Sequence, residues 1–506
     1  MKAFTEPLLS LAGFEEMTKT AEKSSGLISV TGCIDAQKSQ MIYAFGGHRK
    51  NKLIVTFGEQ KAKELYDEYS FFDKEVVYYP SKDVLFYQSD IRGNLLTAER
   101  IRALKAIREQ ERVTLVTTFD ALMNTMAPIE KMWENVLTLE QGQLLDLKEI
   151  QAALIRMGYE KEYQVQTMGQ FSVRGGILDV FPLTEENPIR IELWGDEIDT
   201  IRFFDCESQK SIENTDSVSI YPAAELVLSD EEKAGGIEKL RAEAKRVSDK
   251  LRKQMKTEEA HRVSVMADEL TEEWGELSMY AGMDAFLSYF FDERVGLLDY
   301  FNPSDSLIFF DELTRCTEQG KLTETEFSES MKQRLAMGYI LPGQMNGLFT
   351  EKEIVAKLEK YSCIALGALD NKANGLHQLG SYGIHCQSVS PYNNSFELLI
   401  KDLKRYKKNG YRVILLSGSR TRAKRLSEDI TDQGITCFYT ENYDHELSEG
   451  QIMVCYGKVR RGFEYPILKF AVITESDIFG AQQKKKKRHR TYEGEKIQSF
   501  TDLSVG

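Results

Sequence analysis

The segment 169–205 constrains the fold of this 506-residue chain most strongly, because three short apolar runs follow one another there with little between them. The runs are 177–181, 189–194 and 198–204. Glycine and proline residues punctuate them, and this pattern predicts an antiparallel β-meander. Within the middle run, isoleucine and leucine fall on one face of the strand, whereas Arg190, Glu192 and Trp194 fall on the other.

The second face of the predicted sheet therefore carries arginine and tryptophan side chains that need not be part of the core. Arg174 stands just before the meander, in the sequence V-R-G-G. Tryptophan and arginine are enriched among the anchors of protein–protein interfaces, so this face is a candidate protein-binding surface. The alternative is the ordinary solvated face of a sheet.

The same block carries a long, irregular pattern, F-x-x-R-G-G-x-x-D-x-[FY]-P, followed by P-x-R-x-[ED]-x-[FW]. With this pattern it resembles the small inserted domain that the excision-repair protein UvrB shares with the transcription-repair coupling factor (Mfd) family. The resemblance extends along nearly the full chain. In that family the domain binds UvrA, so the resemblance implies UvrA-contacting roles for Arg174, Arg190 and Trp194. Many family members have phenylalanine at the position of Trp194.

Length and composition are consistent with a folded chain whose partners are proteins. A chain of 506 residues exceeds a single core, and three or four domains are expected. A hydrophobic content of 42% with only 10 prolines is typical of globular proteins. The net charge of −14 disfavours broad, sequence-independent DNA binding, which needs a positive surface.

Cysteine usage and hydropathy indicate the cellular compartment in which this chain is expected. The seven cysteines are scattered and form no CxxC pair, so we expect reduced thiols rather than a disulfide framework or a zinc site. The first residues are rich in acidic side chains and lack the apolar core of a signal peptide. No apolar stretch is long enough to span a bilayer. We therefore expect a cytoplasmic protein without a membrane partner.

A damaged nucleotide-binding motif lies near the start of the chain. A predicted buried strand at 26–31 leads into Gly32, and Lys38 and Ser39 follow at the spacing of a Walker A loop. The motif requires a second glycine where this chain has Gln37, whose side chain would intrude on the phosphate site. The segment is therefore expected to be a strand–loop–helix connection that binds nothing, and a poor nucleotide site is the alternative.

Strands and helices alternate from residue 53 to residue 126, which predicts a parallel sheet. The resemblance identifies this sheet with the first RecA-like lobe of UvrB and related helicases. A second motor signature, an apolar strand ending in Asp311 and Glu312, has the form of a Walker B motif. In a working motor the aspartate holds Mg²⁺ and the glutamate polarises water. With Walker A damaged, we expect a relic. The segment 76–91 is aromatic but shorter than the DNA-threading hairpin of UvrB.

The second half of the chain gives weaker signals. A charged helical stretch at 231–259 and a second helix around 266–274 are expected to pack against the lobe. A further α/β unit follows, with amphipathic helix 396–406 and a strand-to-helix turn at 417–420. That turn offers helix N–H groups to a phosphate, but it lacks the lysine and second glycine of a phosphate loop, so an ordinary turn is expected.

The end of the sequence is basic. The run 482–490 contains four consecutive lysines and two arginines, which predicts either a nucleic-acid contact or, more simply, a solvated tether. In the coupling-factor family the phrase at 500–506 opens the RNA-polymerase-binding domain, and the DNA translocase motor lies beyond it. The resemblance thus implies a chain truncated before both.

The predicted fold class is α/β, with a degenerate RecA-like (P-loop NTPase-like) parallel-sheet lobe that carries an inserted α+β domain and precedes a further α/β domain. The expected units are 1–126 (lobe, first part), 127–220 (inserted UvrA-binding domain), 221–350 (lobe, second part), 351–475 (third α/β domain) and 476–506 (basic linker). The implied partner is UvrA, with RNA polymerase and DNA bound through the missing domains. We expect no enzyme activity and no cofactor here, since ATP and Mg²⁺ belong to the motor. The alternatives are an active P-loop ATPase or helicase half that depends on Lys38 and Asp311, and a DNA-binding protein that uses the basic run.

Overall fold

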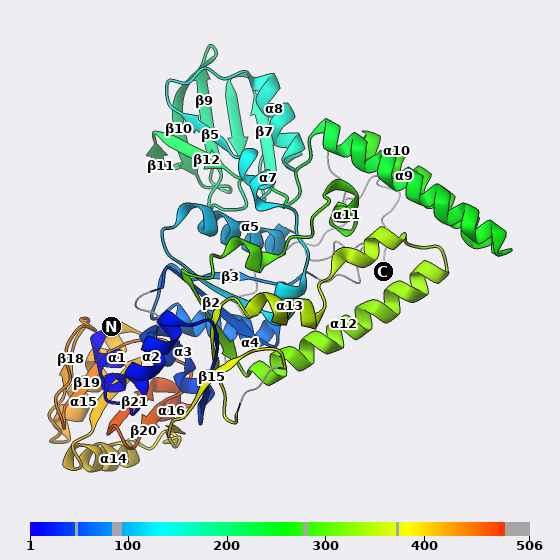
Figure 1. Cartoon of the computed structure of the whole chain (residues 1–506). Helices are drawn as coiled ribbons and strands as arrows, with labels where there is room; N and C mark the ends of the chain where they lie inside the picture. Colours follow the sequence, from blue (N-terminus) through cyan, green and yellow to red (C-terminus); the bar gives the residue numbers. More distant parts are fainter. Residues whose placement is uncertain (46–48, 83–93, 277–281, 371–373, 481–506) are drawn as a thin grey trace, which may run out of the picture.

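The structure is a computed structural model that describes residues 1–45, 49–82, 94–276, 282–370 and 374–480 (Figure 1). The described residues form three sheets of six or seven strands and one two-stranded sheet. The largest sheet has seven strands, all parallel, in the order β15-β1-β14-β13-β2-β4-β3. Its strands are β1 (Gly26–Thr31), β2 (Asn51–Thr56), β3 (Val77–Tyr79), β4 (Val113–Thr118), β13 (Ser306–Asp311), β14 (Ser362–Leu366) and β15 (Gln378–Gly383). The predicted parallel sheet is confirmed.

The central strands β4, β13 and β14 are buried along their whole length, as expected of a parallel sheet covered on both faces. The helices of this part are α1 (Lys2–Leu9), α2 (Phe14–Lys23), α3 (Asp35–Phe45), α4 (Glu59–Tyr69), α5 (Asn94–Glu109), α6 (Phe119–Met123), α7 (Ile129–Glu134), α12 (Leu313–Ala336) and α13 (Glu351–Leu358). Strands β14 and β15 lie in residues that we assigned to the third unit. Their pairing with β1 and β13 corrects that boundary, because the first sheet extends to residue 383.

The inserted unit, residues 137–220, forms a separate sheet at the top of Figure 1. Its strand order is β11-β10-β9-β8-β7-β6, antiparallel except for the short β6–β7 pair, and β5 and β12 form a two-stranded ribbon beside it. The elements are β5 (Leu137–Glu140), α8 (Leu147–Arg156), β6 (Glu160–Lys161), β7 (Gln170–Arg174), β8 (Ile177–Val180), β9 (Ile189–Trp194), β10 (Glu197–Phe204), β11 (Ser211–Thr215) and β12 (Ser217–Ile220). The predicted meander is thus confirmed as β8, β9 and β10.

One face of the inserted sheet forms a core with α8. Alternate residues of the strands, including Leu178, Ile189, Ile191 and Ile201, pack against Leu154 of the helix. The period of two along each strand turns the residues between them to the opposite face. The sequence thus fixes which side chains of β8, β9 and β10 can meet a partner.

A long helical hairpin follows the inserted unit. It consists of α9 (Asp230–Lys253) and α10 (Thr257–Glu276), which pack along one another and extend away from all three sheets in Figure 1. Two helices were expected in this part of the chain, but the break between them lies at 254–256, inside the stretch 231–259 that was expected to be helical throughout. The chain reverses at Met255, whose φ of 62° lies in the left-handed region. Shorter helices then lead to β13: η1 (Met283–Phe286), α11 (Leu287–Phe290) and η2 (Leu297–Tyr300), while η3 (Pro342–Gly347) follows α12.

The third sheet has six strands in the order β16-β20-β21-β17-β19-β18. Its elements are β16 (Gln387–Ser388), α14 (Phe396–Lys408), β17 (Arg412–Ser417), α15 (Arg420–Asp432), β18 (Phe438–Tyr439), β19 (Ile452–Tyr456), β20 (Phe463–Tyr465), β21 (Phe470–Thr474) and α16 (Glu475–Phe479). One continuous core contains residues of this sheet such as Met453, residues of the first sheet such as Phe309, and Phe4 of α1. The first and third sheets are therefore parts of one packed body.

All seven cysteines are free thiols, and five of them are buried, as the sequence predicted. No helix in the described part of the chain is long and apolar enough to cross a membrane. Phe86 and Tyr87 of the aromatic segment and the basic run 482–490 lie outside the described residues.

Candidate functional site

The outer face of the inserted sheet places charged side chains from three strands side by side. Register puts Asp179 of β8 opposite Arg190 of β9, and Arg190 opposite Arg202 of β10. Glu192 lies two residues after Arg190 on the same face. These residues sit between the apolar core positions, so alternation along the strands creates the polar face directly.

A cluster of ion pairs lies in the middle of this face. Arg190 donates from Nε to Asp179 Oδ1 at 2.7 Å and from Nη2 to Oδ2 at 2.9 Å, and Arg174 donates to the same Oδ2 at 2.7 Å. The Asp179 side chain is only 1% exposed, and that of Arg190 is 13% exposed. The Arg190 guanidinium also lies over the ring of Phe204, 4.3 Å from its centroid. The hydrogen bonds to Asp179 raise the pKa of Arg190 above its ordinary value.

Arg190 is therefore a structural partner of Asp179 as well as a candidate contact. We expect Arg190→Ala to lower the free energy of unfolding of the inserted unit by about 2–4 kcal/mol, because a nearly buried carboxylate then keeps only Arg174. Urea titration or amide hydrogen exchange measures the change. The sequence resemblance implied only a partner-contacting role for Arg190, and its ion pair with the buried Asp179 adds a structural one.

Arg202→Ala is the matched control for this substitution. Arg202 forms a bidentate pair with Glu192, at 3.0 Å and 2.5 Å, but the Glu192 side chain is 31% exposed. A pair with that much contact with water contributes about 1 kcal/mol or less. If Arg190→Ala and Arg202→Ala lower the free energy of unfolding equally, the burial of Asp179 does not make its ion pair with Arg190 stronger than an exposed pair.

Trp194 is the most exposed large side chain on this sheet. It ends β9, 85% of its surface is exposed, and Gly195 with a φ of 67° begins the turn into β10. A groove of about 710 Å³ lies beside it, lined by acidic side chains such as Glu197 and Asp199. The exposed indole leaves a large apolar surface in contact with water. Trp194 is therefore the side chain whose burial in a partner's pocket would be most favourable.

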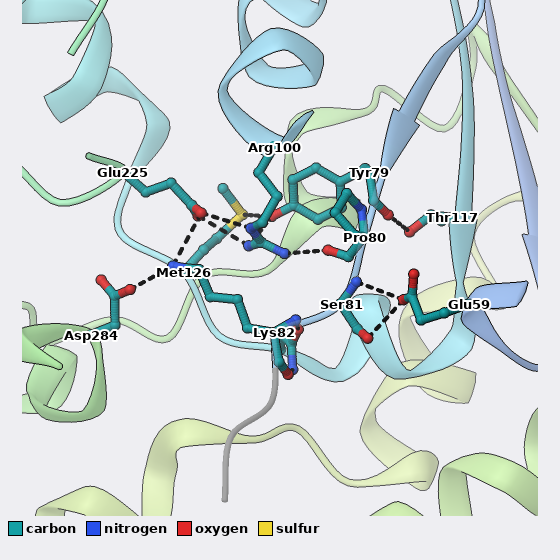
Figure 2. A network of polar contacts seen from close by, with 11 residues as sticks. Glu59, Tyr79, Pro80, Ser81, Lys82, Arg100, Thr117, Met126, Glu225 and Asp284 are labelled. Atoms are coloured by element: carbon teal, nitrogen blue, oxygen red, sulfur yellow. Dashed lines mark hydrogen bonds and ion pairs between the residues drawn. The ribbon is translucent and has the colours of Figure 1, made fainter. Parts of the chain in front are cut away.

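The inserted unit is attached to the first sheet through α5, and Figure 2 shows the buried charges at this junction. Arg100 of α5 is fully buried and donates to both carboxylate oxygens of Glu225, at 2.7 Å and 3.0 Å. Its guanidinium also stacks on Tyr79, 4.1 Å from the ring centroid. Lys82 joins the cluster, 3.1 Å from Glu225 and 2.5 Å from Asp284.

These charges set the protonation of Glu225. Burial alone raises the pKa of its carboxyl group, but Arg100 and Lys82 more than offset burial and lower the pKa to about 2. Closer to the surface, Lys105 pairs with Glu185 at 3.0 Å, and the Tyr221 hydroxyl donates to Glu109 at 2.6 Å. The junction thus joins the segment after β12 to α5 and to the end of β3. These contacts hold the inserted sheet in place relative to the first sheet.

The second candidate site of the sequence lies at the carboxyl ends of β1 and β13. Lys38 Nζ lies 2.5 Å from Asp311, 2.9 Å from Glu312 and 3.2 Å from Asp35. Thr56 donates to the second oxygen of Asp311 at 3.0 Å. Lys38 and Asp311 are each 1% exposed. Burial lowers the pKa of Lys38, but Asp311 and then Glu312 more than offset it, so its pKa lies above its ordinary value.

In the loop before Lys38, backbone N–H groups that could bind a phosphate are hydrogen-bonded to carbonyl groups of the same chain. The N–H groups of Gly32 and Cys33 donate to the carbonyl oxygens of Ala368 and Gly367, at 3.2 Å and 3.0 Å. Gly32 has a φ of 77°, and a Cβ atom there would lie 2.1 Å from the Ile384 oxygen. In a working phosphate loop such N–H groups point at the anion. Here they bind protein carbonyls.

Gln37 and Ser39 lie in α3, which begins at Asp35, and both are buried. The structure brings Gly32, Lys38, Asp311 and Glu312 together at one edge of the sheet. The sequence identified the two motifs separately and did not predict the ion pairs that join them. The third unit has a similar arrangement at the turn 417–420, where the Glu475 carboxylate accepts from the N–H of Gly418 at 2.7 Å.

Two features of the site were missed from the sequence. Asp179 stands between apolar residues in I-L-D-V-F and gives no local signal of its partners, which are five residues before it and 11 residues after it. Arg100 lies in an ordinary helical pattern, and Glu225 in an unpatterned segment. A charged residue inside an apolar run was the one available clue to Asp179.

Comparison with known proteins first defines the class of the inserted unit. Residues 137–226 match the UvrB interaction domain, which includes β5 to β12 and the buried Glu225. The chain therefore carries a unit that matches the UvrB interaction domain on an α/β body.

The whole chain is homologous to the N-terminal part of transcription-repair-coupling factors, as the sequence resemblance indicated. It is 28% identical over 457 residues to the factor of Bacillus subtilis, covering 90% of this chain and 38% of the relative. It is 27% identical over 491 residues to that of Staphylococcus haemolyticus, covering 95% and 40%. The chain thus spans about two fifths of the length of the curated relatives that it matches.

Proposed function

We propose that this chain is a recruitment module that binds UvrA through the outer face of its inserted sheet. The observation that carries the proposal is the match of residues 137–226 to the UvrB interaction domain. The polar face and the exposed Trp194 both lie within this segment. Arg174 is about one-third exposed and keeps donor groups free for acidic side chains of a partner. Trp194 would fill an apolar pocket beside them.

In this proposal the first sheet is a degenerate RecA-like lobe that has a structural role and no motor activity. The ion pairs of Lys38 support it, because a nucleotide phosphate would have to displace Asp311 and Glu312 from the buried ammonium group. The carbonyl oxygens that face Gly32 and Cys33 would also have to withdraw. ATP-driven translocation and contacts with RNA polymerase and DNA, which the resemblance implies for the family, would then depend on other domains. A cytoplasmic location fits these partners.

Trp194→Ala tests the proposed surface. We expect the Kd for UvrA to rise about 30-fold, the equivalent of the roughly 2 kcal/mol that a central aromatic anchor contributes. The stability of the chain should hardly change, because the side chain is 85% exposed. Isothermal titration calorimetry with purified UvrA measures the affinity, and a urea titration measures the stability.

Ile467→Ala is a suitable control, since Ile467 is 75% exposed but lies in the third unit. Its Kd for UvrA should equal that of the unmodified chain. An unchanged Kd for Trp194→Ala would show that the indole is outside the interface. An equal loss for Ile467→Ala would show that binding is not localised to the inserted sheet.

A further inference from the structure

The tip of the helical hairpin concentrates positive charge in an otherwise acidic chain. Residues 241–256 contain seven lysines and arginines but only two acidic residues, Glu243 and Asp249, whereas the whole chain has a net charge of −14. Glu258 and Glu259 follow in the first turn of α10. The hairpin carries this tip away from the three sheets, into solvent (Figure 1).

Internal pairing accounts for only part of this charge. Arg246 pairs with Glu243 at 2.8 Å, and Arg252 approaches Asp249 at 3.7 Å. Arg241 donates to the Thr271 hydroxyl at 3.1 Å. The other four cations are lysines, and all four are exposed and have no ion-pair partner within the described part of the chain. They are Lys245, Lys250, Lys253 and Lys256.

Three of the four lysines share one surface. Lys245, Arg246, Lys250 and Lys253 line a shallow depression of about 580 Å³ on α9, together with Asp249. Along an α-helix, Lys245 and Lys253 are separated by about 12 Å, at a rise of about 1.5 Å per residue. The helix dipole favours cations only in the last turn. It therefore explains Lys250 and Lys253, but it does not explain Lys245, which lies two turns earlier, or Lys256, which lies beyond the helix end.

We propose that the hairpin tip, residues 245–256, is a docking surface for the phosphate backbone of a nucleic acid. One strand of B-DNA advances by about 3.4 Å per phosphate, so about 12 Å of helix faces three or four phosphates. Lysines act there as point charges that need no fixed geometry. A protein partner fits less well, because lysine is depleted from protein interfaces and the one large apolar side chain that is exposed at the tip is Met255.

The test compares three full-length chains in their binding to a fluorescein-labelled 25-base-pair DNA duplex. The first is unmodified, and the second carries Lys245→Gln, Lys250→Gln, Lys253→Gln and Lys256→Gln. The third is the control, with four exposed lysines of α14 and α15 replaced. Its substitutions are Lys401→Gln, Lys404→Gln, Lys408→Gln and Lys424→Gln. Fluorescence anisotropy gives the Kd between about 50 mM and 200 mM NaCl, a range over which phosphate contacts weaken markedly.

We expect the hairpin variant to bind at least about tenfold more weakly at low salt. The slope of log K against log salt should be about 3–4 smaller in magnitude, near one for each lost phosphate contact. The basic run 484–490 is present in all three chains, so its contribution cancels. Equal affinities and slopes for the first two chains, equal losses for the hairpin and control variants, or no binding by the unmodified chain would each overturn the proposal.

Discussion

Glu225→Ala is expected to lower the free energy of unfolding by about 3–5 kcal/mol, among the largest effects of any single substitution in this chain. The variant leaves the fully buried Arg100 without its carboxylate partner and leaves Lys82 with Asp284 alone. Urea titration followed by tryptophan fluorescence measures the change. Glu185→Ala, at the same junction but in a pair that is about one-quarter exposed, should cost less than about 1 kcal/mol.

The same carboxylate predicts an acid limb of stability. The pKa of Glu225 is lowered from 4.5 to about 2 in the folded chain. Its contribution is therefore complete above about pH 4.5 and is lost as the pH falls from there towards 2. Stability measured across this range should fall less steeply for Glu225→Gln than for the unmodified chain. Parallel curves would contradict the assigned pairing.

Lys38→Met is expected to lower the free energy of unfolding by a similar 3–5 kcal/mol. The substitution removes the cation from Asp311, which is 1% exposed, and leaves that carboxylate with only the hydroxyl of Thr56. Because the pKa of Lys38 is raised, its contribution is present at every pH below its ordinary value of 10.5. Chemical denaturation at pH 7 measures the loss.

A double variant separates pairing from packing at this site. Lys38→Met combined with Asp311→Leu removes both buried charges, and we expect it to recover at least half of the lost stability. An additive loss in the double variant would mean that the two residues do not act as a pair. Calorimetry with millimolar ATP is the companion measurement. Heat of binding that disappears in Lys38→Met would show that Lys38 holds a nucleotide, contrary to the structural role proposed for it.

Local patterns predicted much of this fold. Alternation gave the meander and its polar face, and helix periodicity predicted a helix at 396–406, where α14 runs from Phe396 to Lys408. Motif spacing identified the segments of Gly32, Lys38 and Asp311 as two separate nucleotide-site fragments. It predicted neither their proximity nor the ion pairs that join them.

Long-range pairing explains what the sequence could not show. Strand β14 is a short apolar run whose neighbours, β1 and β13, come from distant parts of the chain, so its membership of the first sheet had no local signal. The reversal at Met255 contains neither glycine nor proline and lies among strong helix formers, which hides the hairpin. In the sequence, Asp179 only interrupts an apolar run. Its ion pairs with Arg174 and Arg190 become visible only in the folded sheet.

Hydrogen exchange on the chain alone and on the chain saturated with UvrA tests the central proposal most directly. Strands β7 to β10, from Gln170 to Phe204, supply the proposed surface. We expect exchange to slow in the complex at the amides around Arg174, Arg190 and the turn after Trp194, and to stay unchanged in the third sheet. A complex without protection in this sheet, or the absence of a complex at micromolar concentrations, would contradict the account.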